Sequence, residues 1–205
     1  MGFYGERIFP WVMEKGMSDP RLMAVRKEAL ASATGRVVEI GLGTGLNLPL
    51  YPAAVTELVG VEPNPGMNAR AEERTRGLAF PVRMLPIAGE ALPLADGSAD
   101  TVVCTFVLCT IDDATVALRE MARVLAPGGR LMVLEHGLHE RPGIQRLQRW
   151  LNPLQRVVAC GCRLDRDISA LVEGGGFRWT RLRREAMPGV PATHGYMYLG
   201  EATPG

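Results

Sequence analysis

Short apolar runs alternate with amphipathic segments along most of this chain. Runs of strand length lie at residues 37–40, 57–61, 81–87, 101–108 and 130–134. Several are almost continuously apolar, which is typical of parallel strands covered on both faces. Helical periodicity separates most of them and is clearest over 65–76 and 113–125. The alternation predicts βα units with right-handed crossovers, and therefore a doubly wound, Rossmann-like α/β sheet over residues 36–135.

Further elements flank this core. Asp19 and Pro20 predict the cap and first turn of a helix that runs to about Thr34. Beyond the core we expect helices over 144–158 and about 165–173, and strands over 177–183 and 195–199. The two late strands complete a predicted sheet of seven mostly parallel strands with helices on both faces.

We expect one domain with three parts. The chain has 205 residues, of which 47% are hydrophobic, enough for one sizeable core and short for two domains. Residues 1–35 are expected to form an N-terminal helical lid, 36–137 the cofactor-binding core, and 138–205 the acceptor-side helices and last two strands. The apolar residues of the first part, such as Phe3, Phe9 and Trp11, fit a lid, and fit equally a helix packed elsewhere on the core.

The charge balance limits the partners. Twenty-three basic and 22 acidic residues give a formal charge of +1, so no global field attracts nucleic acid or an anionic membrane. No apolar run reaches the roughly 18 residues that span a bilayer, and the first residues lack the pattern of a secretory signal. These patterns predict a cytoplasmic protein that acts on a small molecule, with no nucleic-acid partner and no stable membrane anchor, and they leave the oligomeric state open.

Three glycines at alternate positions follow the first predicted strand. Gly41, Gly43 and Gly45 occupy the turn that supplies ligand contacts in a doubly wound sheet. Glycine lets main-chain amides approach a ligand, and the N-terminus of a following helix would add positive charge. The dinucleotide pattern G-x-G-x-x-G would need glycine where Leu46 stands, so a pyrophosphate cofactor fits less well. The carboxylate of Glu39 also favours a cationic ligand.

The second strand ends in an acid. Glu62 lies 21 residues after Gly41 (62 minus 41). A carboxylate there can accept hydrogen bonds from both hydroxyls of a ribose. Strand, glycine turn, strand and acid in this order predict a site for an adenosine-like nucleoside.

These motifs resemble those of the class I S-adenosylmethionine-dependent methyltransferases. EIGLGTG is similar to their first motif and VEPNP to their ribose acid and turn. LPIAGEALPLADGSADTVVC is similar to their adenine-contact segment and fourth strand, and MARVLAPGGRLMVLEHG to their next helix, turn and strand. The resemblance implies S-adenosyl-L-methionine as cofactor, with S-adenosyl-L-homocysteine as product. It implies cofactor contacts from Glu39, Gly41, Gly43, Gly45, Asn47, Glu62, Pro63, Gly89, Glu90, Ala91 and Thr105.

The resemblance assigns a part of the cofactor to each group of residues. The three glycines would line its methionine and ribose part, with Glu39 near the amino group. Glu62 would hold the ribose, and Pro63 would lie near the adenine. Glu90 would meet the adenine edge, although it also fits an acid at a helix start. Thr105 would close the floor of the pocket.

A closer likeness extends over most of the chain. GTGLNLPLYP, VVCTFVLCTIDD and ACGCRLDRD are similar to segments of the small methyltransferase-like thiol S-methyltransferases of animals and their bacterial relatives. The animal proteins begin with an apolar membrane-anchoring segment, whereas MGFYGERIFPWVMEKGM carries charges throughout. Membrane attachment is therefore not carried over. Bacterial phospholipid N-methyltransferases share the core motifs, so the resemblance leaves the acceptor open.

A thiol or other soft apolar acceptor is the preferred hypothesis. A thiol is already a few per cent thiolate at neutral pH, so a dedicated base is optional. The alternatives are N-methylation of a phospholipid head group, C- or O-methylation of a quinone-like ring, and a cofactor-binding protein without turnover. A nicotinamide-dependent reductase is a more distant competitor. His136, at the end of the fifth predicted strand, is the candidate catalytic base, and a loop hydrogen bond is its structural alternative.

The cysteines do not predict a metal site. Cys160-x-Cys162 supplies half of a zinc site, and only His136 is expected nearby in the fold, so we expect no metal. Cys104 and Cys109 are expected to fill the core. Cys160 and Cys162 are candidates for the wall of the acceptor pocket. The arginines of residues 146–156 are expected on the solvated face of a helix that covers this pocket.

Overall fold

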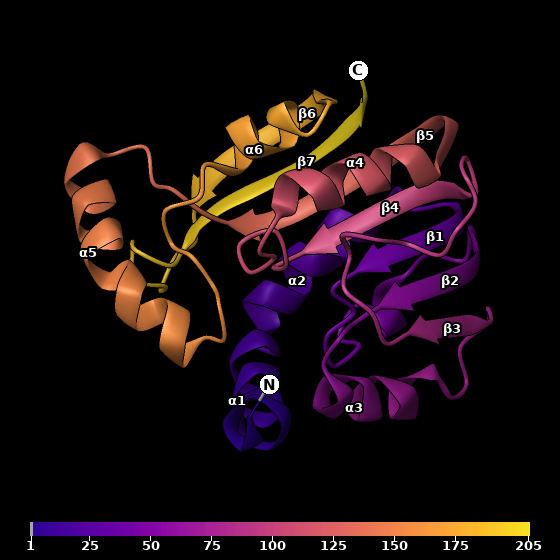
Figure 1. The fold of residues 1–205 in the computed structure, drawn as a ribbon, viewed down its shortest axis with the longest axis horizontal. Helices are drawn as coiled ribbons and strands as arrows, with labels where there is room; N and C mark the ends of the chain where they lie inside the picture. The colour runs from indigo at the N-terminus through magenta and orange to yellow at the C-terminus, as the bar shows by residue number, and fades with distance from the viewer. Residues whose placement is uncertain (1) are drawn as a thin grey trace.

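A twisted seven-stranded sheet forms the centre of the molecule (Figure 1). The computed structural model describes residues 2–205. The strands are β1 (Gly35–Ile40), β2 (Val55–Val61), β3 (Val82–Leu85), β4 (Ala99–Thr105), β5 (Leu125–His136), β6 (Phe177–Ala186) and β7 (Tyr196–Pro204). Their spatial order is β3-β2-β1-β4-β5-β7-β6. β1 to β5 are mutually parallel, and β7 runs antiparallel to both β5 and β6. The predicted fold class is confirmed.

Most of the helices begin within a few residues of the predicted starts, and α2 begins at its predicted cap, Asp19. They are α1 (Phe9–Met17), α2 (Pro20–Leu30), α3 (Pro65–Thr75), α4 (Ala114–Val124), α5 (Pro142–Val158) and α6 (Ile168–Gly174), with a π-helical turn η1 (Tyr4–Ile8). Asp19, Asn64 and Asp113 each accept a backbone N–H of the first turn, as N-cap residues do. The helix expected from about Asp165 begins later, because Asp167 is its cap.

Two predicted elements are different in the structure. The glycine turn after β1 leads into a short 3-10 helix, η2 (Leu48–Leu50), rather than into an α-helix. Pro49 and Pro52 lack the N–H groups that would extend it. The strand expected over 101–108 ends at Thr105, where Phe106 turns the chain with a φ of 55°.

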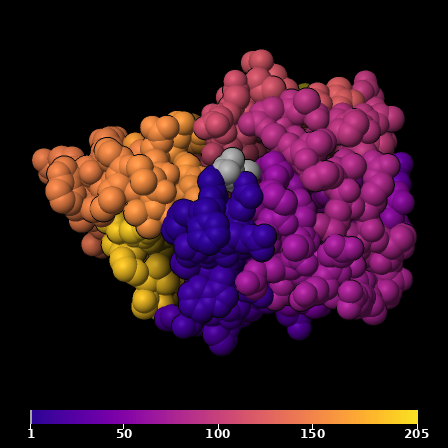
Figure 2. All heavy atoms as spheres, turned by 60° about the horizontal axis from the view of Figure 1, so that its bottom comes forward, coloured from indigo at the N-terminus to yellow at the C-terminus, as the bar shows by residue number. Residues whose placement is uncertain are grey.

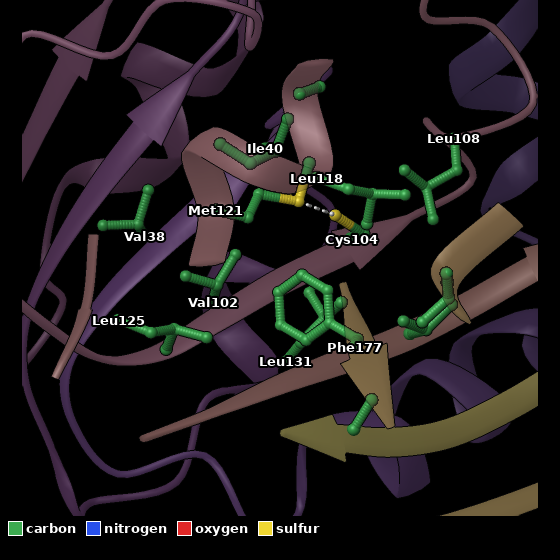
Figure 3. Close-up of a cluster of buried hydrophobic side chains, with 14 of the residues drawn as sticks. Val38, Ile40, Val102, Cys104, Leu108, Leu118, Met121, Leu125, Leu131 and Phe177 are labelled. Atoms are coloured by element: carbon green, nitrogen blue, oxygen red, sulfur yellow. Dashed lines mark hydrogen bonds between the residues drawn. The ribbon is translucent and has the colours of Figure 1, made fainter. Parts of the chain in front are cut away.

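Alternate side chains of the strands face two cores. On one face, Val38, Val102 and Cys104 pack with α4 and α6 (Figure 3), where the Cys104 thiol lies 3.5 Å from the Met121 sulfur. On the other face, Val37 and Val103 pack against residues of α2, α3 and η2. Cys104 is therefore a core residue, as predicted.

The carboxyl ends of β1 to β4 point to one edge of the sheet, where α1 and α5 also lie (Figure 1). The N-terminal residues lie between the α5 region and the β2–α3 region in Figure 2. Among residues 2–205, every helix is too short or too polar to cross a bilayer. The edge of the sheet at the carboxyl ends of β1 to β4 holds the residues that the sequence singled out.

Candidate active site

Two of the three glycines in the turn after β1 lie where a side chain would clash with its neighbours. All three have positive φ, at 71° for Gly41, 57° for Gly43 and 79° for Gly45. A Cβ on Gly41 would lie 2.4 Å from Val107 Cγ2, and one on Gly45 would lie 3.1 Å from the Cα of Ala71 in α3. A Cβ on Gly43 would meet only the Gly41 carbonyl oxygen, 3.9 Å away. Gly43 is thus the glycine whose backbone faces open space where a ligand can approach.

Glu62 ties the end of β2 to this turn. Its two carboxylate oxygens accept hydrogen bonds from the Gly43 N–H at 3.0 Å and the Asn64 N–H at 2.9 Å. Burial raises the pKa of Glu62, and these two backbone bonds oppose the rise. Each oxygen retains one lone pair, so the carboxylate can also accept bonds from a vicinal diol.

A buried polar network lies beneath the turn and joins three of the predicted residues. The Asn47 amide donates to Glu39 Oε1 at 2.7 Å and to Thr105 Oγ1 at 2.9 Å. The Tyr51 hydroxyl donates to Glu39 Oε2 at 2.8 Å. Burial raises the pKa of Glu39 to about 7, although the bonds from Tyr51 and Asn47 and the charge of Arg26 lower it. A cation placed here would stabilise the ionised carboxylate.

Arg26 completes this network and was not predicted from the sequence. It lies on α2 and is 6% exposed, and its Nη1 donates to Asn47 Oδ1 at 2.8 Å and to Thr105 Oγ1 at 3.1 Å. Its Nε is buried without a partner among the described residues. Its guanidinium also lies 5.0 Å from the ring centre of Phe106. The detectable signal was an arginine at helical spacing from Ala29 and Leu30, on the buried face of the predicted helix.

The residues present fit a cationic nucleoside with a carboxylate. Glu39 can balance positive charge, the free Nε of Arg26 can meet a carboxylate, and Glu62 can accept a diol. Gly89, Glu90 and Ala91 lie in the turn between β3 and β4, with Gly89 buried against Ile40 of β1. Glu90 is half-buried. It lies in a turn and therefore not at the start of a helix. Pro63 is exposed at the end of β2.

The N-terminal segment (residues 2–17) lies on the rim beside Glu62. The Asn64 amide donates to the Gly5 carbonyl oxygen at 2.8 Å. Glu14 of α1 forms ion pairs with Arg70 and Arg74 of α3. On the other side, the Tyr4 hydroxyl donates to the Val158 carbonyl oxygen of α5 at 2.8 Å. The segment therefore bridges the nucleoside side and the α5 side of this edge.

His136 lies at the end of β5, where it contacts a cysteine. Its Nε2 is 3.2 Å from Cys162 Sγ, and Cys162 Sγ is 3.8 Å from Cys109 Sγ. His136 Nδ1 is buried without a partner among residues 2–205. The hydrogen bond with Cys109 and burial raise the pKa of the Cys162 thiol. Cys109 fills the core as predicted, but its thiol also joins this group.

Phe106 lies near both groups of polar residues. Its ring centroid is 6.4 Å from that of His136 and 5.0 Å from the Arg26 guanidinium carbon. Glu135, which is fully buried, holds this loop in place because its Oε1 accepts the N–H groups of Val107 and Leu108, both at 2.6 Å. Neither Phe106 nor Glu135 was predicted as part of the site.

One cysteine and two histidines complete the residues of these types. Cys160 is half-buried with a φ of 46°. His194 Nε2 is 3.3 Å from the side-chain oxygen of Gln155 on α5, and the ring of His139 stacks on Tyr196.

The arginines of α5 are exposed, as expected, but they share the exposed surface with apolar side chains. The one buried side chain of α5 is Gln148, which donates to the carbonyl oxygens of Gly137 and Thr193. Its exposed side chains are largely apolar, and they include Leu147, Trp150, Leu154, Val157 and Val158. The helix therefore presents an apolar face among its arginines.

A family model and two named relatives match this chain. The model described as "Methyltransferase domain" matches residues 38–133. Human thiol S-methyltransferase TMT1A is 32% identical over 182 residues, which cover 85% of this chain and 74% of that protein. Rat thiol S-methyltransferase TMT1B is 35% identical over 158 residues, or 74% of this chain and 64% of its own length, somewhat under two thirds.

Solved structures share the architecture. A structure of a SAM-dependent methyltransferase from Thermotoga maritima aligns with a TM-score of 0.68 at 23% identity, and the alignment covers 97% of this chain and 98% of that one. This likeness concerns the fold.

Proposed function

Because this chain belongs to the S-adenosylmethionine-dependent methyltransferases, we propose that it transfers a methyl group from S-adenosylmethionine to a small thiol or another soft, apolar acceptor. One observation carries the proposal. The ring of Phe106 lies near Arg26, which belongs to the network of Glu39, and also near His136, which contacts Cys162. This proximity supports a donor site and an acceptor site beside each other.

The nucleoside residues have separate roles in this proposal. When bound, S-adenosylmethionine supplies an electrophilic methyl group on a positively charged sulfur. Glu62 and the Gly43 backbone hold its ribose, and Gly89 to Ala91 with Pro63 border its adenine. Glu39 balances its positive charge, and Arg26 meets its carboxylate through the free Nε. Thr105 and Asn47 hold the Arg26 side chain in position.

A thiol acceptor suits the surroundings of His136. Sulfur nucleophiles need little activation, because a thiol is partly ionised near neutral pH. Holding the two reactants in line can supply up to about 7 to 11 kcal/mol in favourable cases. The aromatic ring of Phe106 and the sulfur of Cys162 make this wall apolar and polarizable, which favours a soft acceptor over a charged one.

The N-terminal segment acts as a lid in this proposal. Its hydrogen bonds to Asn64 and Val158 support closure over both sides of the edge. Closure would exclude water from the reacting pair. Removing residues 2–17 should weaken the binding of S-adenosylhomocysteine while leaving the cooperative unfolding of the core intact. Unchanged affinity would contradict the lid.

An acceptor screen tests the proposed activity. The full chain is incubated with methyl-labelled S-adenosylmethionine and a panel of small thiols, amines and phenols, and the methylated products are identified. Thiols should be methylated fastest. Calorimetry with S-adenosylhomocysteine, and a thermal-shift comparison with NADH, measure nucleoside binding separately. Donor binding with transfer to no acceptor would favour a binding protein, whereas stabilisation by NADH alone would overturn the assignment of the site.

Methylation at a lipid surface is the second candidate, and α5 favours it. The helix carries three arginines and no acidic residue, and its exposed apolar side chains include Trp150 at 76% and Val157 at 75% exposed. Such a face suits the interface of an anionic membrane. A lipid acceptor predicts that anionic vesicles raise the activity and that Trp150→Gln removes this increase. Equal rates with and without vesicles would leave the small thiol as the acceptor.

A further inference from the structure

Three metal-binding side chains meet beside the proposed donor site. Cys109 follows β4, His136 ends β5, and Cys162 follows α5. Their ligand atoms all lie within 4.8 Å of one another. Both cysteines are buried, at 2% and 9% exposed. The sequence predicted no metal because Cys109 was expected to fill the core, so only half a zinc site was visible.

Two of the three spacings are close to those of tetrahedral coordination, and the third pair of atoms lies within 4.8 Å. Zinc binds sulfur at about 2.3 Å and imidazole nitrogen at about 2.0 to 2.1 Å, so a tetrahedral ion holds two sulfurs about 3.8 Å apart and a sulfur and nitrogen about 3.5 Å apart. The corresponding distances are 3.8 Å between Cys109 and Cys162 and 3.2 Å between Cys162 and His136. We propose that Cys109, His136 and Cys162 bind one Zn²⁺ ion whose fourth position is open to the sulfur of the acceptor.

The chemistry of the ligands selects the metal. Two thiols and an imidazole favour zinc over magnesium or calcium, which prefer oxygen ligands. Three protein ligands are typical of catalytic zinc sites, whereas structural sites use four. Within the described chain, no other histidine, cysteine or carboxylate joins the three-atom group. The fourth position therefore falls to an exogenous ligand.

A disulfide accounts for less of the geometry. Cys109 and Cys162 would have to close from 3.8 Å to about 2.05 Å between the sulfurs. A disulfide between the two cysteines would not involve His136, although His136 Nε2 lies 3.2 Å from Cys162 Sγ. A zinc ion uses all three groups, and it needs only small side-chain shifts from the spacing that they have.

This inference rests on the proposed thiol methylation and gives it a means of activation. The acceptor thiol binds zinc through sulfur and releases its proton to water. The zinc-bound thiolate then forms the new bond to the methyl carbon, while the bond from that carbon to the donor sulfur breaks and its electron pair stays on that sulfur. The neutral thioether is a weaker ligand than a thiolate and leaves. His136 is then a metal ligand, and no base is needed.

Metal binding alone provides the first test. The full chain is reduced, stripped with a chelator and titrated with Zn²⁺ and with Co²⁺. We expect one ion per chain, and for Co²⁺ the intense visible bands of a tetrahedral site with thiolate-to-metal charge transfer. Cys109→Ser and Cys162→Ser should each weaken zinc binding by more than about 100-fold, since loss of even an outer partner costs 10- to 100-fold. Cys160→Ser is the matched control from the same segment and should bind zinc normally.

Several outcomes would overturn the site. These are the absence of saturable zinc binding, equal loss in Cys160→Ser, and a Cys109–Cys162 disulfide in the protein as isolated that carries no zinc. His194→Ala should retain the ion. Loss of zinc in His194→Ala would make the site a closed one with four protein ligands, and the open position would be refuted.

Binding of the acceptor at the open fourth position of the metal is tested in the absence of methyl transfer. Adding a small thiol to the Co²⁺ form, with no donor present, should shift the charge-transfer bands. An unchanged spectrum would refute acceptor binding at the metal. If the metal-free chain methylates thiols at the full rate, the zinc inference fails and the proposed function stands. If zinc binds and responds to thiols but no thiol is ever methylated, the proposed function fails instead.

Discussion

Replacing Glu39 by glutamine should remove a pH dependence from the stability of the ligand-free chain. Burial raises the pKa of Glu39 from an ordinary value of 4.5 to about 7. The folded chain therefore keeps this proton to a higher pH than the unfolded chain does. The stability from Glu39 is fully present below about pH 4.5 and is lost as the pH rises towards 7, beyond which the curve flattens.

The size of the effect follows from the shift. A rise from 4.5 to about 7 corresponds to about 3 kcal/mol between the two limits. Glu39 is 1% exposed, so solvent screening reduces this little. Glutamine has the same shape, and its oxygen can still accept the Asn47 amide while its NH₂ group donates to the Tyr51 oxygen. The variant should therefore fold.

Urea unfolding at pH 5, 6, 7 and 8 measures this difference. The free energy of unfolding of the wild-type chain should fall relative to that of Glu39→Gln by about 2.5 kcal/mol over this range, because pH 5 already lies above 4.5. All other ionisable groups are the same in both proteins, so the difference isolates Glu39. S-adenosylmethionine should reduce the fall for the wild-type chain, because a nearby cation stabilises the carboxylate. Parallel curves for the two ligand-free proteins would refute the reasoning.

Three further predictions concern the turn, the ribose acid and the core. Glu62→Gln should weaken S-adenosylhomocysteine binding at least 10-fold in calorimetry, and equal affinity would contradict the ribose role. It should also cost about 1 to 3 kcal/mol of stability, because one backbone N–H then faces an NH₂ group. Gly45→Ala should lower the melting temperature more than Gly43→Ala does, because its Cβ would crowd the α3 backbone, whereas Gly43→Ala should lose nucleoside affinity; the reverse order in thermal melts would contradict this assignment. Met121→Ala should cost about 2 to 5 kcal/mol in urea unfolding without changing nucleoside affinity, because it leaves a cavity in the core.

Local signals allowed most of the fold to be predicted. Caps such as Asp19, Asn64 and Asp113 act on amides two or three residues away, so the sequence around them locates the helix starts. One of the failures involves a distant partner. The fourth strand ends early because Glu135 takes the amides of the loop after it, across 27 and 28 residues of sequence.

The same distinction applies to the candidate site. Glu39, Asn47 and Thr105 were predicted through motifs, and the structure joins them in one network. Arg26 was missed because a helical stripe that contains one arginine looks like an ordinary solvated face. Cys109 and Cys162 are 53 residues apart, and no local pattern relates them. Only the order of the strands brings their sulfurs together.

The direction of β7 has a practical consequence for labelling. Because β7 runs opposite to its neighbour β5, it carries the chain away from the edge that holds Glu62 and His136, and Gly205 emerges at the far side (Figure 1). Residues near Gly5 lie at the mouth of that edge. A fluorophore or affinity tag joined after Gly205 should leave nucleoside exchange undisturbed, whereas the same group joined ahead of Gly5 would crowd the entrance.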